Sequence, residues 1–169
     1  EVGCAESLLS LELASTGFHV TGIDLAPNEF RHPCIEFIRG DVLEHPLGHG
    51  RFDIAIALST VEHIGLAAYG PERPSGDRDC LDQIGTALKP GGRFLLTVPF
   101  GRAGRAPRYR VYDRAGLDRL TDGFRVEREE FYLDTDGGGW RPAEAVDLAG
   151  VDSVSSDRVR GVVCSVLER

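Results

Sequence analysis

Acidic residues and a small-residue turn near the start of the chain are spaced like the parts of a nucleoside-binding site. Glu1 precedes the turn Gly3, Cys4 and Ala5, a leucine-rich stretch follows, and Asp24 ends the next β-rich run. A turn of small residues between a strand and a helix lets the backbone approach a ligand closely, and the helix N-terminus supplies free N–H donors. A carboxylate about twenty residues later, at the tip of the next strand, can accept both hydroxyls of a ribose. This spacing serves NAD and S-adenosylmethionine equally.

Two features of this stretch favour S-adenosylmethionine. The turn has Gly3 where a dinucleotide fingerprint has several glycines, and the carboxylate of Glu1 would repel a pyrophosphate but suit the ammonium of a methionine moiety. Asp41 ends the following β-rich run and can accept a hydrogen bond from an adenine amino group, with Val42 in apolar contact with the ring. We also assign Leu25, directly after Asp24, to the cofactor site.

These side chains need elements that bring them to one edge of a sheet. Apolar periodicity, β-rich runs and Pro or Gly stops predict helix 5–16, strands 18–24 and 35–41, the buried strand 51–59, helix 80–92 and strand 93–100. The nearly uninterrupted apolar run at 51–59 is typical of a parallel strand covered on both faces. The order predicts an α/β fold with a doubly wound, Rossmann-like parallel sheet.

The tail of the chain changes character. It predicts an amphipathic helix at 112–124, a more polar strand at 125–133, a turn at 134–142, a short helix at 143–150 and a last apolar strand at 160–169. Because no long helix separates the two strands, we expect them to pair antiparallel at the sheet edge.

At this point the chain resembles class I S-adenosylmethionine-dependent methyltransferases, and in particular the methyltransferase-11-like enzymes of small molecules. The resemblance covers nearly the whole chain and rests on five motifs in order: "EVGCAES", "GIDLAP", "RGDVLEHPL", "FDIAIALSTVEHIG" and "ALKPGGRFLLTVP". It implies one methyltransferase domain over 1–169, S-adenosyl-L-methionine as cofactor, and seven strands with the last one antiparallel. Ala5 and Ser7 depart from the family, which usually has glycines there.

The stretch "STVEHIGLAAYG" follows the buried strand and lies where ligands of such sheets collect. Ser59 and Thr60 are expected to flank the cofactor, and Glu62 and His63 to face the substrate. Methylation of a hydroxyl needs in-line placement of the acceptor and a base, and the imidazole of His63 is the natural base. Equally open is a structural role in which Glu62 and His63 cap a helix and brace the loop.

An arginine-rich stretch at 101–114 also contains Tyr109 and Tyr112. Arginine with aromatic residues can hold a carboxylate, a phosphate or a nucleotide-linked sugar. We expect most of these arginines to be solvated loop residues, with one or two lining the acceptor pocket.

Composition bounds the remaining choices. The net charge of -8 disfavours nucleic acid and anionic membranes as partners, and no apolar run reaches the length of a membrane span. The four cysteines lie far apart, as expected for reduced thiols in a cytoplasmic protein, and Pro46 and Gly48 argue against a metal site at His45 and His49. Because the chain contains no methionine and Glu1 already belongs to a motif that follows a buried strand, we expect residues upstream of it, including an apolar run.

The leading interpretation is methyl transfer to a small-molecule acceptor, with oxygen favoured over nitrogen or carbon, because the insertions are short and no recognition domain is added. One alternative is an NAD(P)-dependent oxidoreductase, although Asp113 stands where a Tyr-x-x-x-Lys pair starting at Tyr109 would need lysine. The other is a catalytically inactive cofactor-binding module. Composition does not predict an oligomeric state.

Overall fold

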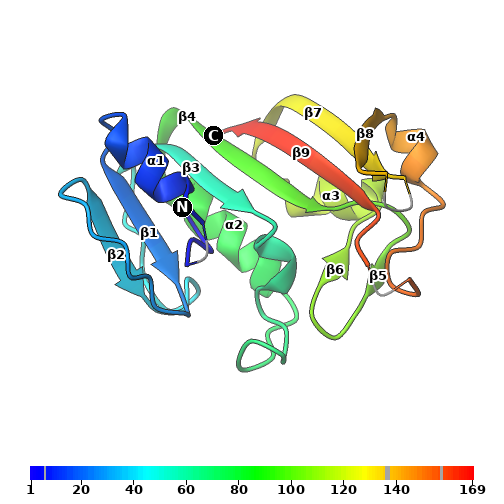
Figure 1. Cartoon of the computed structure of the whole chain (residues 1–169), viewed down its shortest axis with the longest axis horizontal. Coiled ribbons are helices and arrows are strands. Elements are labelled where there is room, and N and C mark those ends of the chain that lie inside the picture. The colour runs from blue at the N-terminus through cyan, green and yellow to red at the C-terminus, as the bar shows by residue number, and fades with distance from the viewer. Residues whose placement is uncertain (6, 136–137, 157) are drawn as a thin grey trace.

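The largest sheet of the molecule is mixed and has five strands. The computed structural model describes residues 1–5, 7–135, 138–156 and 158–169. The strand order is β3-β4-β9-β7-β8, formed by β3 (Phe52–Leu58), β4 (Leu88–Pro99), β7 (Arg125–Asp134), β8 (Trp140–Ala143) and β9 (Gly161–Glu168). Strands β3 and β4 are parallel, and the other neighbours are antiparallel. Figure 1 shows this sheet running across the molecule from β3 to β8.

A separate sheet pairs β1 (Val20–Asp24) with β2 (Ile35–Arg39) in parallel. Val2 joins the two sheets, because it forms an isolated parallel bridge with Ile23 of β1 and its N–H donates to Ile56 of β3 at 2.9 Å. The expected single sheet of seven strands is therefore not what forms: β1 and β3 do not pair directly, and Val2 provides a single bridged residue between them.

The expectation of an antiparallel last strand is confirmed. Strand β9 runs antiparallel to both β4 and β7 and lies between them. Its burial alternates residue by residue, so one face contributes Val163 and Leu167 to the core. The pair β7–β9 is not at the sheet edge, however, because Trp140–Ala143 forms the further strand β8 instead of part of a turn. Asp136 and Gly137 of the expected turn lie outside the described residues.

The helices agree with the predicted positions but differ in their bounds. They are α1 (Leu9–Ser15), the short 3-10 helix η1 (Val61–His63), α2 (Gly76–Ala87), α3 (Arg114–Leu120) and α4 (Ala145–Leu148). Helix α2 ends before the predicted 92 because Leu88 already pairs with Phe52 as the first residue of β4. Helix α3 begins after Asp113, whose side chain accepts the Gly116 N–H at 2.7 Å. Glu6, in the predicted helix 5–16, lies outside the described residues.

The core lies between α2, α3 and the buried side chains of β4 and β9. Fully buried residues include Leu81, Ile84, Phe94, Leu96, Val98, Leu117 and Leu167. Each such side chain contributes roughly 1.5–3 kcal/mol by leaving water. This packing fixes β3 and β4, so the loop after β3 starts from a rigid strand end.

The carboxyl ends of β1, β2 and β3 point to the same edge, the lower one in Figure 1. Two segments extend beyond that edge, below it in Figure 1: the loop 64–75 and the hairpin of β5 (Gly104–Arg105) and β6 (Arg110–Val111). They touch, since the Arg110 guanidinium donates to the Ile64 carbonyl at 2.7 Å. The fold thus gathers three strand ends and two loops around one opening.

Candidate active site

A pocket of about 350 Å³ opens at the carboxyl ends of β1, β2 and β3. Most of the predicted site residues line it: Gly3, Ala5, Asp24, Leu25, Asp41, Val42, Thr60 and His63. Glu1, Cys4, Ser59 and Glu62 are not among its lining residues. The structure thus brings together side chains that the sequence places up to about sixty residues apart, because parallel strands end at one edge.

Asp24 is the last residue of β1, and both of its carboxylate oxygens are held in place. One oxygen accepts the Ala5 N–H at 3.0 Å and the other accepts the Ala26 N–H at 2.8 Å. A carboxylate has about four lone-pair positions, so each oxygen keeps capacity for a further donor. An oriented carboxylate of this kind suits two neighbouring hydroxyl groups.

Asp41 follows β2 and lies across the pocket. One of its oxygens accepts the Leu43 N–H at 2.9 Å, and the other lies 4.0 Å from a guanidinium nitrogen of Arg73. Val42 beside it is buried and apolar. A hydrogen-bond acceptor next to an apolar wall suits a heteroaromatic base with an amino group. The carboxylates of Asp24 and Asp41 and the side chain of Val42 therefore fit an adenosine-bearing ligand.

Gly3 and Thr60 approach each other closely. Gly3 has φ +78°, and a Cβ there would lie 2.2 Å from Oγ1 of Thr60. The glycine is therefore required by the packing of Thr60. The Gly3 N–H is also engaged, donating to the Ile23 carbonyl at 2.9 Å. The sequence interpretation, in which the glycine gives a ligand close access to the backbone, missed this protein contact.

Ser59 turns the chain so that Thr60 enters the pocket. Among the described residues it is the only non-glycine with a positive φ, at +49°, a conformation that costs an L-residue energy. Its N–H donates to the Thr97 carbonyl at 3.1 Å and to the Thr97 hydroxyl at 2.8 Å. Ser59 thus sets the direction of the chain before Thr60, and its own contact with the cofactor stays a prediction.

Glu1 and Cys4 face other parts of the molecule. The Glu1 carboxylate accepts the Ser10 hydroxyl at 2.5 Å and lines a different cavity, of about 730 Å³, between β1 and β3. Cys4 is buried against β1, where a Cβ on Gly22 would lie 2.7 Å from its sulfur, and burial raises the pKa of its thiol to about 11. Cys4 is thus a neutral core residue, and the role of Glu1 toward an amine stays a prediction.

His63 ends η1, and the tautomer of its neutral ring follows from its partner. Nδ1 is hydrogen-bonded to the backbone carbonyl of Arg108. A carbonyl can only accept, so Nδ1 carries the proton and Nε2 of the neutral ring has the free lone pair. Nε2 lies 3.9 Å from Oε1 of Glu62, and the imidazole packs on the Tyr69 ring with centroids 5.1 Å apart. The geometry therefore leaves a basic nitrogen at the pocket.

Glu62 points into the protein interior. It is 2% exposed, and within the described part of the chain its Oε2 has no hydrogen-bond partner. Burial raises the pKa of this carboxyl from 4.5 to about 8. Glu62 is thus an uncharged acid at neutral pH, next to the basic nitrogen of His63.

A buried cluster on the hairpin holds η1 from behind. Arg110 donates to the Glu62 carbonyl at 3.3 Å, and its Nε lies 3.6 Å from Asp77 of α2. The Tyr112 hydroxyl donates to the same Asp77 at 2.8 Å. Burial is the main cause that raises the pKa of Tyr112, and the negative charge of Asp77 raises it further. Arg110 thus braces η1 together with the hydrogen bond from His63 to the Arg108 carbonyl, while no side chain of the described residues caps η1.

The loop after η1 forms a wall of the pocket; its first part lies in the stretch 59–70 that the sequence placed near the ligand, but none of its residues was assigned to the site. Its pocket residues are Ile64, Gly65, Leu66, Tyr69, Gly70, Pro71 and Arg73. Its two ends are closed on each other, because a Cβ on Gly65 would lie 2.3 Å from the Arg73 carbonyl oxygen and one on Gly76 would lie 2.8 Å from the Gly65 Cα. In the sequence, the signal for this closed loop is the pair Gly65 and Gly76, which stand at the two ends of a polar stretch.

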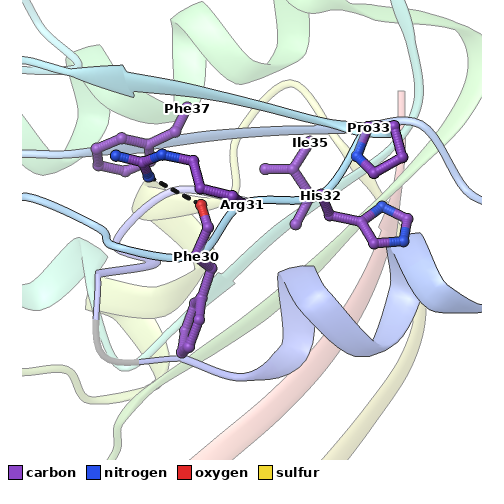
Figure 2. Close-up of a pocket in the computed structure, with 6 residues that line it drawn as sticks. All are labelled: Phe30, Arg31, His32, Pro33, Ile35 and Phe37. Atoms are coloured by element: carbon purple, nitrogen blue, oxygen red, sulfur yellow. Dashed lines mark hydrogen bonds between the residues drawn. The ribbon is translucent and has the colours of Figure 1, made fainter.

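A third recess, of about 470 Å³, lies at the start of β2 and is lined by Phe30, Arg31, His32, Pro33, Ile35 and Phe37 (Figure 2). The Arg31 guanidinium donates to the carbonyls of Asn28 and Phe30 at 3.0 and 2.9 Å, so its charge faces the backbone. None of the predicted site residues is there. Across the described ranges no group of three or more His, Cys, Asp or Glu side chains could hold a metal ion, and no helix is long and apolar enough to cross a membrane.

Comparisons with known proteins agree with this geometry. A family model described as "Methyltransferase domain" matches residues 1–96, which is more than half of the chain. A ubiquinone biosynthesis O-methyltransferase from Methylobacterium nodulans is 33% identical over 107 residues, 58% of this chain and 39% of that protein. The sterol 4-C-methyltransferase strm-1 from Caenorhabditis elegans is 27% identical over 107 residues, 57% of this chain and 29% of that protein. The chain thus spans less than half the length of these relatives.

Among solved structures, the chain is similar to a Burkholderia thailandensis 1,6-didemethyltoxoflavin-N1-methyltransferase with bound 1,6-didemethyltoxoflavin and S-adenosylhomocysteine. The TM-score is 0.64 at 16% identity, covering 99% of this chain and 69% of that chain. At this identity the similarity establishes the fold. With the family model, it confirms the resemblance of the motifs to class I S-adenosylmethionine-dependent methyltransferases, and the chain belongs to the methyltransferase domain family.

Proposed function

We propose that this chain transfers the methyl group of S-adenosyl-L-methionine to a hydroxyl oxygen of a small-molecule acceptor. The observation that carries the proposal is the convergence of Asp24, Asp41, Thr60 and His63 on one pocket. The first two suit a nucleoside, and the last two lie at the strand end where transfer would take place. An NAD(P)-dependent oxidoreductase has no comparable support, because the family model is that of a methyltransferase.

The cofactor side is assigned from the carboxylates. Asp24 would accept the two ribose hydroxyls, since backbone N–H groups already fix the direction of its oxygens. Asp41 would accept the adenine amino group, while Val42 and Leu25 contact the faces of the base. When bound, the cofactor supplies an electrophilic methyl group on a sulfonium. The protein's part is to hold acceptor and methyl in line.

His63 is proposed as the general base. Its Nδ1 is committed to the Arg108 carbonyl, so a proton leaving an acceptor hydroxyl is taken up at Nε2. Glu62, neutral because its pKa is raised to about 8, leaves no unpaired negative charge behind the ring. A base matters for oxygen acceptors because a neutral hydroxyl is a weak nucleophile.

The relatives differ in the atom that their names give as the methyl acceptor. The names describe methyl transfer to oxygen, to carbon and to nitrogen. The O-methyltransferase matches at the higher identity of the two curated relatives, and the free Nε2 of His63 suits a hydroxyl. We therefore extend oxygen as the acceptor to this chain, with a small molecule rather than nucleic acid as substrate and the cytoplasm as its site of action.

Titration calorimetry with S-adenosylhomocysteine tests the cofactor. Binding is expected for the wild type and a loss of about tenfold or more for Asp24→Asn, which weakens charge-assisted hydrogen bonds to the ribose. Asp53→Asn is the matched control, because Asp53 is an exposed acid paired with Lys89 at 2.7 Å. No heat at high micromolar ligand, or thermal protection by NAD and not by S-adenosylhomocysteine, would contradict the proposal.

A further inference from the structure

The arginines of the stretch 101–114 differ in their electrostatic partners. Four are paired with carboxylates: Arg102 with Asp152, Arg105 with Glu72, Arg110 with Asp77, and Arg114 with Glu129. For Arg108, the described residues offer no carboxylate within ion-pair distance, and its guanidinium contacts the Tyr69 hydroxyl, with Nε 3.5 Å from the oxygen. Within this stretch, Arg108 is thus the arginine whose charge no protein carboxylate offsets in the described structure. The charge of Arg108 is therefore available to a ligand.

Arg108 lies beside the proposed base. Its guanidinium carbon is 5.9 Å from the centroid of the Tyr69 ring, and the His63 ring packs on that same ring at 5.1 Å. The backbone carbonyl of Arg108 accepts a hydrogen bond from Nδ1 of His63. The cation and the imidazole thus both contact the ring of Tyr69. A single small molecule can reach both.

Nearby acidic groups do not neutralise this cation. Glu72 is engaged by Arg105, Asp41 and Glu44 are engaged by Arg73, and Glu62 is buried away from the opening. A ligand that brings its own negative charge would meet a positive group that no protein carboxylate offsets. Such a charge-assisted contact is about twice as strong as a neutral hydrogen bond, and it strengthens as the bound ligand excludes water.

We propose that Arg108 binds a carboxylate of the acceptor, so that the substrate is a small hydroxy acid with its hydroxyl at Nε2 of His63 and its carboxylate at the guanidinium. Tyr69 is the flat surface between the two groups. This assignment rests on the proposed function and adds the charge of the substrate to it. Arg108 is here a residue that determines specificity, and His63 acts on the proton.

Calorimetry on the complex with S-adenosylhomocysteine tests the charge requirement. The probes are 2-, 3- and 4-hydroxyphenylacetate, each matched with its hydroxyphenylacetamide, which keeps the hydroxyl and ring but lacks the charge. At least one acid is expected to bind about tenfold more tightly than its amide, and Arg108→Ala is expected to remove that preference. Arg108→Lys should restore part of it, because a lysine keeps the charge without the planar fork.

Arg102→Ala is the control, since Arg102 lies in the same loop but is paired with Asp152. It should keep the preference for the acid. The proposal is overturned if acids and amides bind equally, if none of the acids binds, or if Arg108→Ala leaves the preference unchanged. It is also overturned if Arg108→Ala weakens S-adenosylhomocysteine itself, because the arginine would then serve the cofactor. Failure of the wild type to bind S-adenosylhomocysteine instead rejects the proposed function.

Discussion

The two sides of the pocket are built in different ways. On the cofactor side, Asp24 and Asp41 each accept a backbone N–H from two residues further on, at Ala26 and Leu43, and Asp24 also accepts the N–H of Ala5. On the acceptor side, His63 is oriented by the Arg108 carbonyl, 45 residues away in sequence. The comparison teaches that both carboxylates on the cofactor side have a partner in a local turn, whereas the His63 ring is held by a long-range partner, so the two sides should respond differently to mutation.

The largest expected effect is on the acceptor side. His63→Ala should lower kcat by about 10²- to 10⁴-fold, the usual contribution of a general base, while the affinity for S-adenosylhomocysteine changes little. Steady-state kinetics with an acceptor that the wild type methylates and calorimetry with S-adenosylhomocysteine measure the two quantities. Turnover that stays at the wild-type level across pH would remove His63 from the role of base.

Arg110→Leu should disturb the long-range contacts next. The change leaves Asp77 as a buried acid without its cationic partner, and breaking a buried pair of this kind costs about 3–5 kcal/mol. Denaturant unfolding gives the free energy of unfolding. Arg105→Leu is the control, because Arg105 and its partner Glu72 are both exposed. A loss as small in Arg110→Leu as in Arg105→Leu would show that the hairpin does not brace η1.

Glu62 predicts a pH dependence of stability. Its pKa in the folded protein is about 8, above the ordinary 4.5, so the folded state binds this proton more tightly than the unfolded state. The contribution is fully present below about pH 4.5 and is lost as the pH rises toward 8. Between pH 5 and 8.5 the wild type should lose on the order of a few kcal/mol from this group, and Glu62→Gln should not.

Urea unfolding of both proteins at several pH values measures this difference, with Glu44→Gln as a variant at an exposed acid. His63, Arg110, Asp77 and Tyr112 surround the same region and are present in both proteins, so the comparison cancels their direct titration. Equal pH slopes for the wild type and Glu62→Gln would contradict the buried, uncharged state of Glu62.

The smallest of these effects belongs to the cofactor side. Asp41→Asn keeps an oxygen able to accept the Leu43 N–H, removes the charge and replaces the second oxygen with an amide NH2. The affinity for S-adenosylhomocysteine should fall by about tenfold or less, with kcat at saturating cofactor unchanged. Calorimetry and kinetics together separate the two quantities. A fall in kcat at saturating cofactor would mean that the division between the two sides is wrong.

The same division explains what could be predicted from the sequence. Asp24, Asp41 and Thr60 follow β-rich runs directly, and a strand end fixes where the next residue lies, so their convergence was predictable. The direction of Glu1 depends on Ser10 in α1, and the wall from Ile64 to Arg73 depends on glycines that touch across the loop. Those contacts join residues whose separation no local period encodes.

Bounds of elements failed for a related reason. Helix α2 ends at Ala87 because Leu88 pairs with Phe52, a partner that helical periodicity cannot report. Strand β8 exists because Trp140–Ala143 pairs with β7, although its glycine-rich approach favours a turn. The number of strands in one sheet was wrong because a single residue, Val2, connects β1 to β3.

That connection has a consequence for how the molecule responds to its ligand. Asp24 and Asp41 belong to the β1–β2 sheet and its loops, and Thr60 follows the five-stranded sheet. A ligand that contacts all three therefore connects the two sheets, which the protein itself joins at Val2. At a hundred times its dissociation constant, such a ligand adds about 2.7 kcal/mol to the folded state. We expect that gain to appear as slower amide exchange in β1 and β2.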